Sequence, residues 1–169
     1  MALLLGSPGV GKTLLSKRLQ TCSAKGNDGM DVPLVTSATV GLNLIDVNIG
    51  RKQEVTITEV GGCMAPIWPK YYKETKRLMF VIDMSNRMQI SASCIQLLGL
   101  LDSDQLQDAA FLLIFNKMDM PNAMNRCEFG AIVRLEEIIQ NAVQKVTVVE
   151  VSAKEGRGLQ DIIKWLQDT

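Results

Sequence analysis

Apolar residues follow two alternating patterns along this chain. Nearly continuous apolar runs lie at residues 78–82, 111–115 and 146–151, as is typical of parallel strands that are covered on both faces. In three other segments apolar residues recur at helical spacing, and these stripes are Ile90, Cys94, Leu97, Leu98 and Leu101; Ile132, Leu135, Ile138 and Ile139; and Leu159, Ile162, Ile163 and Leu166. Each stripe is predicted to be the buried face of one helix.

Two strand-like segments have no helix between them. Residues 42–49 and 53–59 are separated only by Gly50, Arg51 and Lys52, and they are predicted to form an antiparallel hairpin. A further strand is expected at residues 2–5. The order of the elements indicates an α/β fold with a six-stranded, mostly parallel sheet, the hairpin at one edge and helices on both faces.

Composition favours one domain that spans residues 1–169. Of the 169 residues 47% are hydrophobic, and no linker or repeat interrupts the alternating elements. The 18 Lys and Arg residues balance the 18 Asp and Glu residues, so charge offers no case for binding nucleic acid or an anionic membrane surface. We therefore expect no nucleic-acid partner, and we expect a monomer.

The cysteines and the chain ends narrow the expected metal site, compartment and mode of membrane attachment. Cys22, Cys63, Cys94 and Cys127 lack C-x-x-C spacing, so neither a zinc site nor a disulfide framework is indicated, and a cytoplasmic location is expected. Without histidine, a metal site must use oxygen ligands, which suits Mg²⁺. The sequence shows neither a run of the ~20 apolar residues that span a membrane nor a lipidation motif. Because the chain begins inside its first strand, a trimmed N-terminus is expected.

A phosphate-binding loop is the first candidate site. The pattern G-x-x-x-x-G-K-[ST] is matched by Gly6, Ser7, Pro8, Gly9, Val10, Gly11, Lys12 and Thr13. The match lies between a strand and a helical segment, where backbone N–H groups and the helix dipole can hold a polyphosphate. Lys12 is expected to reach the β- and γ-phosphates, and the Thr13 hydroxyl to bind Mg²⁺. A chance glycine-rich turn is the alternative, and a second motif opposes it.

That second motif, at the end of the run 111–115, selects guanine. Asn116, Lys117 and Asp119 match N-K-x-D, and the Asp119 carboxylate can only accept hydrogen bonds, which suits the two adjacent donors of guanine and not adenine. Lys117 is expected to lie along the base and Asn116 to tie this loop to the phosphate loop. The loop after residues 146–151 supplies further expected guanine contacts, from Ser152, Ala153 and Lys154. An ATP-dependent kinase is thereby disfavoured.

The order of these motifs resembles that of small GTPases of the Ras superfamily, and in particular of the ADP-ribosylation factor-like (Arf-like) branch. The resemblance also rests on Thr39-Val40-Gly41-Leu42-Asn43, Glu59-Val60-Gly61-Gly62, Pro66-Ile67-Trp68 and Tyr71-Tyr72. It implies a three-layer P-loop NTPase fold that binds GTP or GDP with Mg²⁺ and recruits effectors through its switch segments when GTP is bound. It also implies a role in membrane or ciliary traffic, with association to Golgi or cilia through partners.

By this resemblance, Thr39 in the first switch binds Mg²⁺ and the γ-phosphate, and Gly62 in the second donates its N–H to the γ-phosphate. Glu59 stands where the family has an Asp that holds Mg²⁺ through water, and it is one methylene longer. Cys63 stands at the catalytic position, where the family has the Gln that orients the attacking water. We therefore expect a GTPase with slow or impaired hydrolysis; the alternative is a GTP-binding scaffold with little or none.

The resemblance also suggests an unusual effector surface. The family's three aromatic effector-pocket positions correspond to Leu42, Thr58 and Tyr71, so two aromatic side chains are missing. Weak binding of generic Arf effectors is expected, with a distinct GTP-dependent surface around Leu42, Ile67, Trp68 and Tyr71. For Trp68, packing against the sheet is the alternative.

Overall fold

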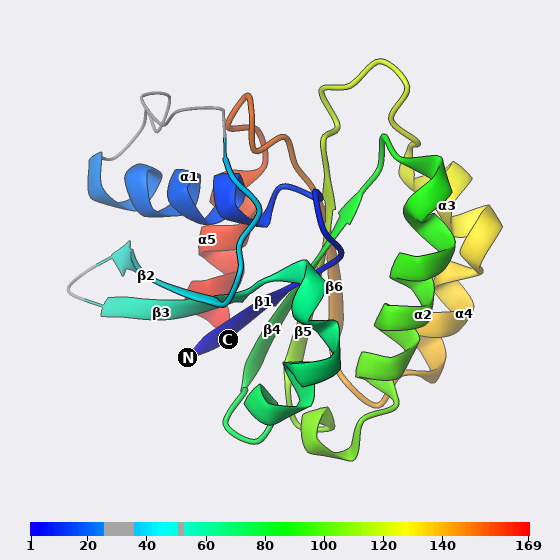
Figure 1. Ribbon diagram of the computed structural model, residues 1–169, viewed down its shortest axis with the longest axis horizontal. Helices are drawn as coiled ribbons and strands as arrows, with labels where there is room; N and C mark the ends of the chain where they lie inside the picture. The colour runs from blue at the N-terminus through cyan, green and yellow to red at the C-terminus, as the bar shows by residue number, and fades with distance from the viewer. Residues whose placement is uncertain (26–35, 51–52) are drawn as a thin grey trace.

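Six strands form one sheet in the order β2-β3-β1-β4-β5-β6. The computed structural model describes residues 1–25, 36–50 and 53–169, and its strands are β1 (Ala2–Leu5), β2 (Leu42–Gly50), β3 (Gln53–Val60), β4 (Arg77–Asp83), β5 (Ala110–Asn116) and β6 (Val146–Glu150) (Figure 1). β2 and β3 pair antiparallel, and all other neighbours pair parallel. The predicted fold and its edge hairpin are confirmed; Arg51 and Lys52, in the predicted hairpin connection, lie outside the described residues.

Helices cover both faces of the sheet. α1 (Lys12–Lys25) and α5 (Leu159–Asp168) lie on one face, and α2 (Ile90–Leu101), α3 (Arg126–Val133) and α4 (Leu135–Asn141) lie on the other (Figure 1). Shorter 3₁₀ segments lie at Gly62–Tyr71, Arg87–Gln89 and Asp104–Leu106. Within the described ranges, no helix combines the length and the apolar character needed to cross a bilayer.

Two separate cores explain why the central strands are apolar at nearly every position. Leu4 and Met79 pack into the core beneath α1 and α5, whereas their neighbours Leu3 and Leu78 pack into the core beneath α2 and α3. Successive side chains of a strand point to opposite faces, so a strand covered on both faces has no solvent-exposed position to fill with polar residues.

The predicted helical stripes are only partly correct. α5 buries its whole stripe, Leu159, Ile162, Ile163 and Leu166. α2 buries Ile90, Ser93, Leu97 and Leu100, whereas Leu98 is 47% exposed and was wrongly assigned to the core. An apolar residue one position away from the buried stripe is rotated by about 100° around the helix, because each turn contains 3.6 residues.

Arg134 divides what the sequence predicts as a single helix. Its φ of 54° and ψ of 49° place it in the left-handed region, between α3 and α4. Ile132 is exposed whereas Leu135, just beyond the break, is buried. The single stripe through Ile132, Leu135, Ile138 and Ile139 was therefore wrong, because helical spacing does not reveal a residue whose left-handed backbone ends one helix and begins another.

Candidate functional site

The predicted site residues meet at the carboxyl ends of β1, β3 and β5, where two cavities adjoin. One cavity of about 220 Å³ is lined by residues that include Pro8, Gly9, Gly11, Lys12, Thr13, Thr39, Glu59, Gly62 and Cys63. The second, of about 200 Å³, is lined by Gly11, Leu14, Asn116, Lys117, Asp119, Met120, Ala153 and Lys154. Gly11 lines both cavities. Ligands of open α/β sheets bind at this end of the strands.

In the first cavity the phosphate loop surrounds the Lys12 ammonium group. Nζ of Lys12 donates hydrogen bonds to the backbone oxygens of Gly6, at 2.8 Å, and Ser7, at 3.0 Å. Lys12 is only 6% exposed, and burial lowers its pKa to about 8, although the nearby Glu59 and Cys63 act in the opposite direction. Because a cation with so little access to water is stabilised by an anionic ligand, the loop fits a polyphosphate.

We expect nucleotide affinity to fall as the pH rises from 8 to 9. Above pH 8 the nucleotide-free protein holds Lys12 increasingly in its neutral form, whereas phosphate oxygens favour the charged form, so binding takes up a proton. Affinity should then fall by up to about tenfold for each pH unit and should change little below pH 8. Calorimetric titration of GDP in buffers of different ionisation enthalpy would measure the proton uptake.

Lys12→Arg is the control for this pH effect, because a guanidinium stays charged throughout the range. The arginine variant should bind with little proton uptake, and any ionisation of the base itself would remain visible in it. Equal proton uptake by the two proteins at pH 8.5 would contradict the assignment to Lys12.

Oxygen atoms of three predicted metal ligands converge beside the phosphate loop. The Thr13 and Thr39 hydroxyls lie 2.8 Å apart, and each donates to Oε1 of Glu59, Thr39 at 3.2 Å. Ser16 and Asn43 donate to the other carboxylate oxygen, each at 3.3 Å. The longer Glu59 side chain therefore reaches both hydroxyls directly, and its expected contact with Mg²⁺ through water stays a prediction.

This oxygen set fits Mg²⁺ better than a metal held by protein alone. The part of the chain that the structure describes contains no group of three or more His, Cys, Asp or Glu side chains able to hold a metal ion. One carboxylate and two hydroxyls leave most of an octahedral shell to be filled by water and phosphate oxygens, which is how Mg²⁺ is commonly held beside nucleotides.

In the second cavity Asn116 joins three loops. Its Nδ2 donates to the backbone oxygen of Val10 at 2.8 Å, and its Oδ1 accepts from the backbone N–H of Ala153 at 3.1 Å. Asp119 accepts from the Ser152 hydroxyl at 2.6 Å, and its other oxygen lies 4.0 Å from Nζ of Lys154. The Asp119 carboxylate is thus oriented by its neighbours while it keeps accepting positions that face the cavity.

Several residues that support the site were missed by the sequence reasoning. Asp83, buried at the end of β4, forms an ion pair with Nζ of Lys117 at 2.6 Å, and the same Nζ donates to the Gly9 oxygen at 2.8 Å. From α1, Arg18 donates to the backbone oxygen of Lys154 at 3.1 Å. Asp83 could have been found, since it is the first polar residue after the run 78–82 and stands at the carboxyl end of a strand. Nothing in the sequence around Arg18 indicates that this helical residue is buried and supports the site.

The two switch segments approach each other and the phosphate loop. The backbone N–H of Gly61 donates to the Gly41 oxygen at 3.1 Å. A Cβ atom at Gly62 would lie 2.6 Å from the carbonyl carbon of Ser7 and 2.8 Å from the Gly6 oxygen, so this approach requires glycine. Cys63 follows at the exposed margin of the cavity, with its Sγ 3.9 Å from the Thr39 oxygen. Pro8, opposite, has no N–H to offer a phosphate.

Trp68 belongs to the core, so its predicted place on an effector surface is wrong. It is 3% exposed, its ring packs edge-on against Phe80 with the centroids 6.4 Å apart, and its Nε1 donates to the Gly61 oxygen at 3.4 Å. Tyr71 is partly buried, whereas Leu42 and Leu44 on the edge strand β2 are exposed. Exposed apolar surface near the switches therefore lies on β2 and at Val40 just before it.

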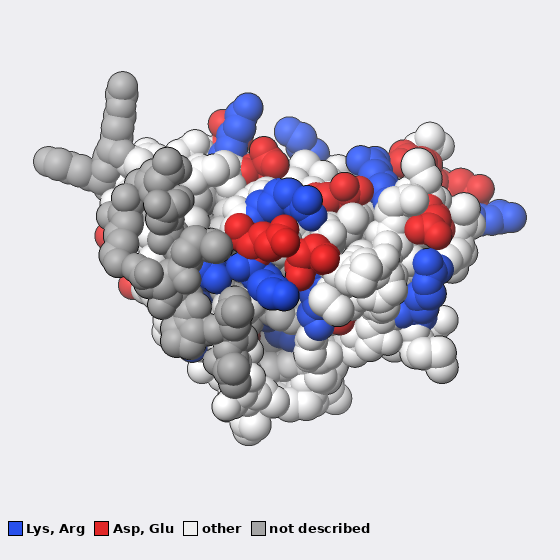
Figure 2. Space-filling model, turned by 90° about the horizontal axis from the view of Figure 1, so that it is seen from above, with Lys and Arg blue, Asp and Glu red and all other residues white. Residues whose placement is uncertain are grey.

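Charges are mixed on the face of the molecule seen in Figure 2. Basic and acidic side chains lie next to one another there, and neither sign occupies a continuous field. The site itself follows this pattern, since Lys117 pairs with Asp83, and Lys154 lies near Asp119. The described residues of this face show no continuous basic stripe of the kind found in nucleic-acid-binding proteins.

Known proteins resemble the chain over its whole length. The model of the ADP-ribosylation factor family matches residues 1–169. Human ADP-ribosylation factor-like protein 16 is 50% identical over 170 residues, which cover 100% of this chain and 85% of that protein. ADP-ribosylation factor-like protein 1 of Saccharomyces cerevisiae is 29% identical over 168 residues, which cover 98% of this chain and 85% of that protein. The Arl6 BBS3 small GTPase from Trypanosoma brucei with bound nucleotide analogue GppNp has the same fold, with a TM-score of 0.81 at 20% identity, over 99% of this chain and 95% of that one.

Proposed function

The chain belongs to the ADP-ribosylation factor family, and from this we propose that its GTP-bound form recruits effector proteins in membrane or ciliary traffic. As an Arf-like small GTPase it is a nucleotide-dependent switch, and members of this family bind GTP or GDP with Mg²⁺. The observation that carries the assignment of the site is the meeting of the two cavities at Gly11, one around a buried ammonium group and the other around the Asp119 carboxylate.

In this proposal the phosphates lie against residues 6–13, with Lys12 as their principal cation. Thr13, Thr39 and Glu59 would hold Mg²⁺, which neutralises phosphate charge when it is bound. The base occupies the second cavity, where Asp119 accepts its two donors and the Lys117 stem lies along its face. The contacts of Gly62 and Thr39 would make both switch segments depend on a γ-phosphate.

A competition titration tests this assignment. GTP and GDP should displace a fluorescent guanine nucleotide, whereas ATP should be weaker by about 10⁴-fold or more, because adenine leaves the buried Asp119 carboxylate without its donors. Comparable affinities for ATP and GTP would refute it.

We propose further that hydrolysis is slow without a partner protein. Cys63 lines the phosphate cavity and stands in the sequence where the family has the water-orienting glutamine, and its thiol is a weak donor and acceptor. The cavity's carboxylate, Glu59, already accepts hydrogen bonds from both threonines and from Ser16 and Asn43. A scaffold that binds GTP with little or no hydrolysis is the second candidate function, and it rests on the same features.

Intrinsic GTP turnover should be about 10⁻⁴ s⁻¹ or slower, since unassisted GTPases that do carry the glutamine reach only that range. Single-turnover hydrolysis on homogeneous protein, with and without cell extract, measures it. Acceleration by extract would favour the partner-dependent enzyme, and its absence the scaffold. Turnover hundreds of times faster without extract would show that another group orients the water, and both readings would then fail.

The GTP-dependent surface is proposed to centre on β2 and Tyr71. Leu42 is 48% exposed and Leu44 lies further along the same strand, whereas Thr58 at the family's aromatic position is buried. Affinity capture with protein loaded with a non-hydrolysable GTP analogue, compared with GDP, would identify effectors and show whether they belong to Golgi or ciliary traffic. Generic Arf effector domains should bind weakly, and strong binding that survives Leu42→Ala would contradict this surface.

A further inference from the structure

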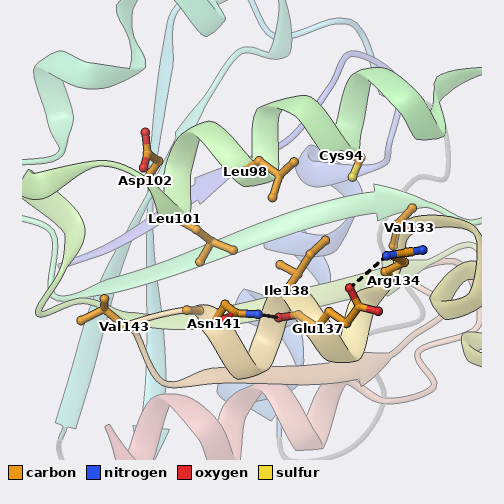
Figure 3. Close-up of a pocket in the computed structure, with 11 residues that line it drawn as sticks. Cys94, Leu98, Leu101, Asp102, Val133, Arg134, Glu137, Ile138, Asn141 and Val143 are labelled. Atoms are coloured by element: carbon orange, nitrogen blue, oxygen red, sulfur yellow. Dashed lines mark hydrogen bonds and ion pairs between the residues drawn. The ribbon is translucent and has the colours of Figure 1, made fainter.

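An apolar groove lies between α2 and the α3–α4 pair, away from the nucleotide site. Its volume is about 520 Å³, and its apolar lining comes from Cys94, Leu98 and Leu101 on one side and Val133, Ile138 and Val143 on the other (Figure 3). Val143 is 77% exposed, and Ile95, one turn before Leu98 on the same face of α2, is 71% exposed. Large apolar side chains gathered at one open hollow mark an interaction surface.

Three of the polar side chains that line the groove have partners within the chain. Arg134 pairs with Glu137 at 3.4 Å, and the amide of Asn141 donates to the backbone oxygen of Glu137 at 2.7 Å (Figure 3). Asp102, at the opposite end of the groove, is exposed, and its carboxylate has no ion-pair partner among the residues that the structure describes. The groove therefore carries a net negative charge at one end.

The position of Asp102 strengthens this charge. Asp102 is the C-cap of α2 and its N–H donates to the Leu98 oxygen at 2.9 Å, so its carboxylate stands at the negative end of the helix dipole. Beside it, Gln144 is buried and donates to the Leu101 oxygen at 2.9 Å, while its own Oε1 has no hydrogen-bond partner in the described part of the chain. Since Gln144 is buried and does not line the groove, Asp102 is the acceptor at this end that an external cation would meet.

We propose that this groove binds an amphipathic α-helix of a partner protein that carries Lys or Arg one turn beyond its apolar stripe. The eight steps along α2 from Cys94 to Asp102 span about 12 Å, and apolar residues at i, i+3 or i+4, and i+7 of a helix span about 10 Å. The apolar stripe fills the groove and the following basic residue meets Asp102. A second copy of this chain fits less well, because a two-fold contact would set one concave surface against another.

Binding should be independent of the nucleotide state. The lining contains no residue of either switch segment, neither residues 36–39 nor Gly62–Tyr71. The partner would thus be held in both the GDP and the GTP state, in contrast to an effector. This difference separates the groove experimentally from the proposed switch function.

Two synthetic peptides of equal length provide the probe. Each is a 16-residue alanine-based helix, constrained by a lactam bridge on its outer face, with Leu at positions 4, 8 and 11; position 15 is Lys in one and Glu in the other. They are titrated into isotope-labelled, GDP-loaded full chain and followed by NMR. Resonances of Cys94, Leu98, Leu101 and Ile138 should shift, and the Lys peptide should bind about fivefold more tightly than the Glu peptide.

Matched variants assign the binding to the groove. Leu98→Asp should weaken the Lys peptide about tenfold or more, whereas Leu44→Asp, the same change at an exposed leucine on β2, should leave it unaffected. Asp102→Lys should reverse the preference between the two peptides, and Asp108→Lys, with the same change in net charge at another exposed aspartate, should not. Loading with a GTP analogue should change neither affinity by more than about twofold.

The proposal is overturned by the absence of saturable binding at millimolar peptide, by binding that Leu98→Asp leaves intact, or by shifts confined to the switch segments. It is also overturned if binding requires the GTP analogue, which would instead extend the effector surface of the proposed switch. Shifts of the groove resonances with protein concentration alone would assign the groove to self-association and not to a partner helix.

Discussion

Replacing Asp119 by asparagine is expected to weaken GDP binding by about 10²- to 10⁴-fold and to create affinity for xanthosine diphosphate. The carboxylate accepts from Ser152 at 2.6 Å and keeps further accepting positions toward the second cavity. Two hydrogen bonds from guanine to a charged acceptor contribute about 1.5–3 kcal/mol each. An asparagine presents a donor where guanine also has donors, whereas the C2 carbonyl of xanthine accepts from that amide.

The change in nucleotide specificity is measured by displacing fluorescent GDP and fluorescent xanthosine diphosphate from the unchanged protein and from the Asp119→Asn variant. Asp108→Asn removes the same charge from an exposed position and should change neither affinity. If the Asp119 variant lost GDP without gaining xanthosine diphosphate, Asp119 would be a structural residue of the loop and not the group that reads the base.

Replacing Asn116 by alanine is expected to weaken all nucleotides together, by at least about 30-fold. Asn116 is buried, and its removal leaves the Val10 oxygen and the Ala153 N–H without partners. Each buried polar group left unpaired costs about 1–3 kcal/mol, so about 2–6 kcal/mol of loop positioning is lost. Because Asn116 joins the phosphate loop to the guanine loops, GDP and GTP should be affected to a similar extent.

Nucleotide dissociation rates and thermal unfolding would be measured on the same preparation. Asn122→Ala is the matched control: its Nδ2 also donates to a backbone oxygen, that of Ser85 at 3.0 Å, but Asn122 lines neither cavity. A loss of affinity for GTP much larger or much smaller than the loss for GDP would contradict the proposed role, because a residue that only joins loops does not distinguish the two nucleotides.

The nucleotide motifs and the order of the elements along the chain were accessible from the sequence because both are local signals. Contiguous patterns such as residues 6–13 and 116–119 specify a backbone shape together with the groups that it presents. Continuous apolar runs also identify strands that are covered on both faces. The sheet and its antiparallel edge pair match these predictions.

The residues that support the nucleotide site were harder to predict from the sequence. Asp83 and Lys117 are far apart in sequence, as are Arg18 and Lys154, and each pair meets only because the sheet brings strand ends and α1 together. The direct contact of Glu59 with two threonine hydroxyls likewise depends on where the first switch segment lies.

Sequence alone thus determined the elements, their order and the ligand chemistry at the strand ends, because each is encoded by neighbouring residues. Tertiary structure decided which apolar residues remain exposed: Trp68 packs on Phe80, whereas Leu98 faces an open groove. The left-handed backbone of Arg134 separates α3 from α4 beside that groove, and no periodic pattern predicts it. Helical spacing shows which side chains share a face, but only the packing of distant elements determines what that face meets.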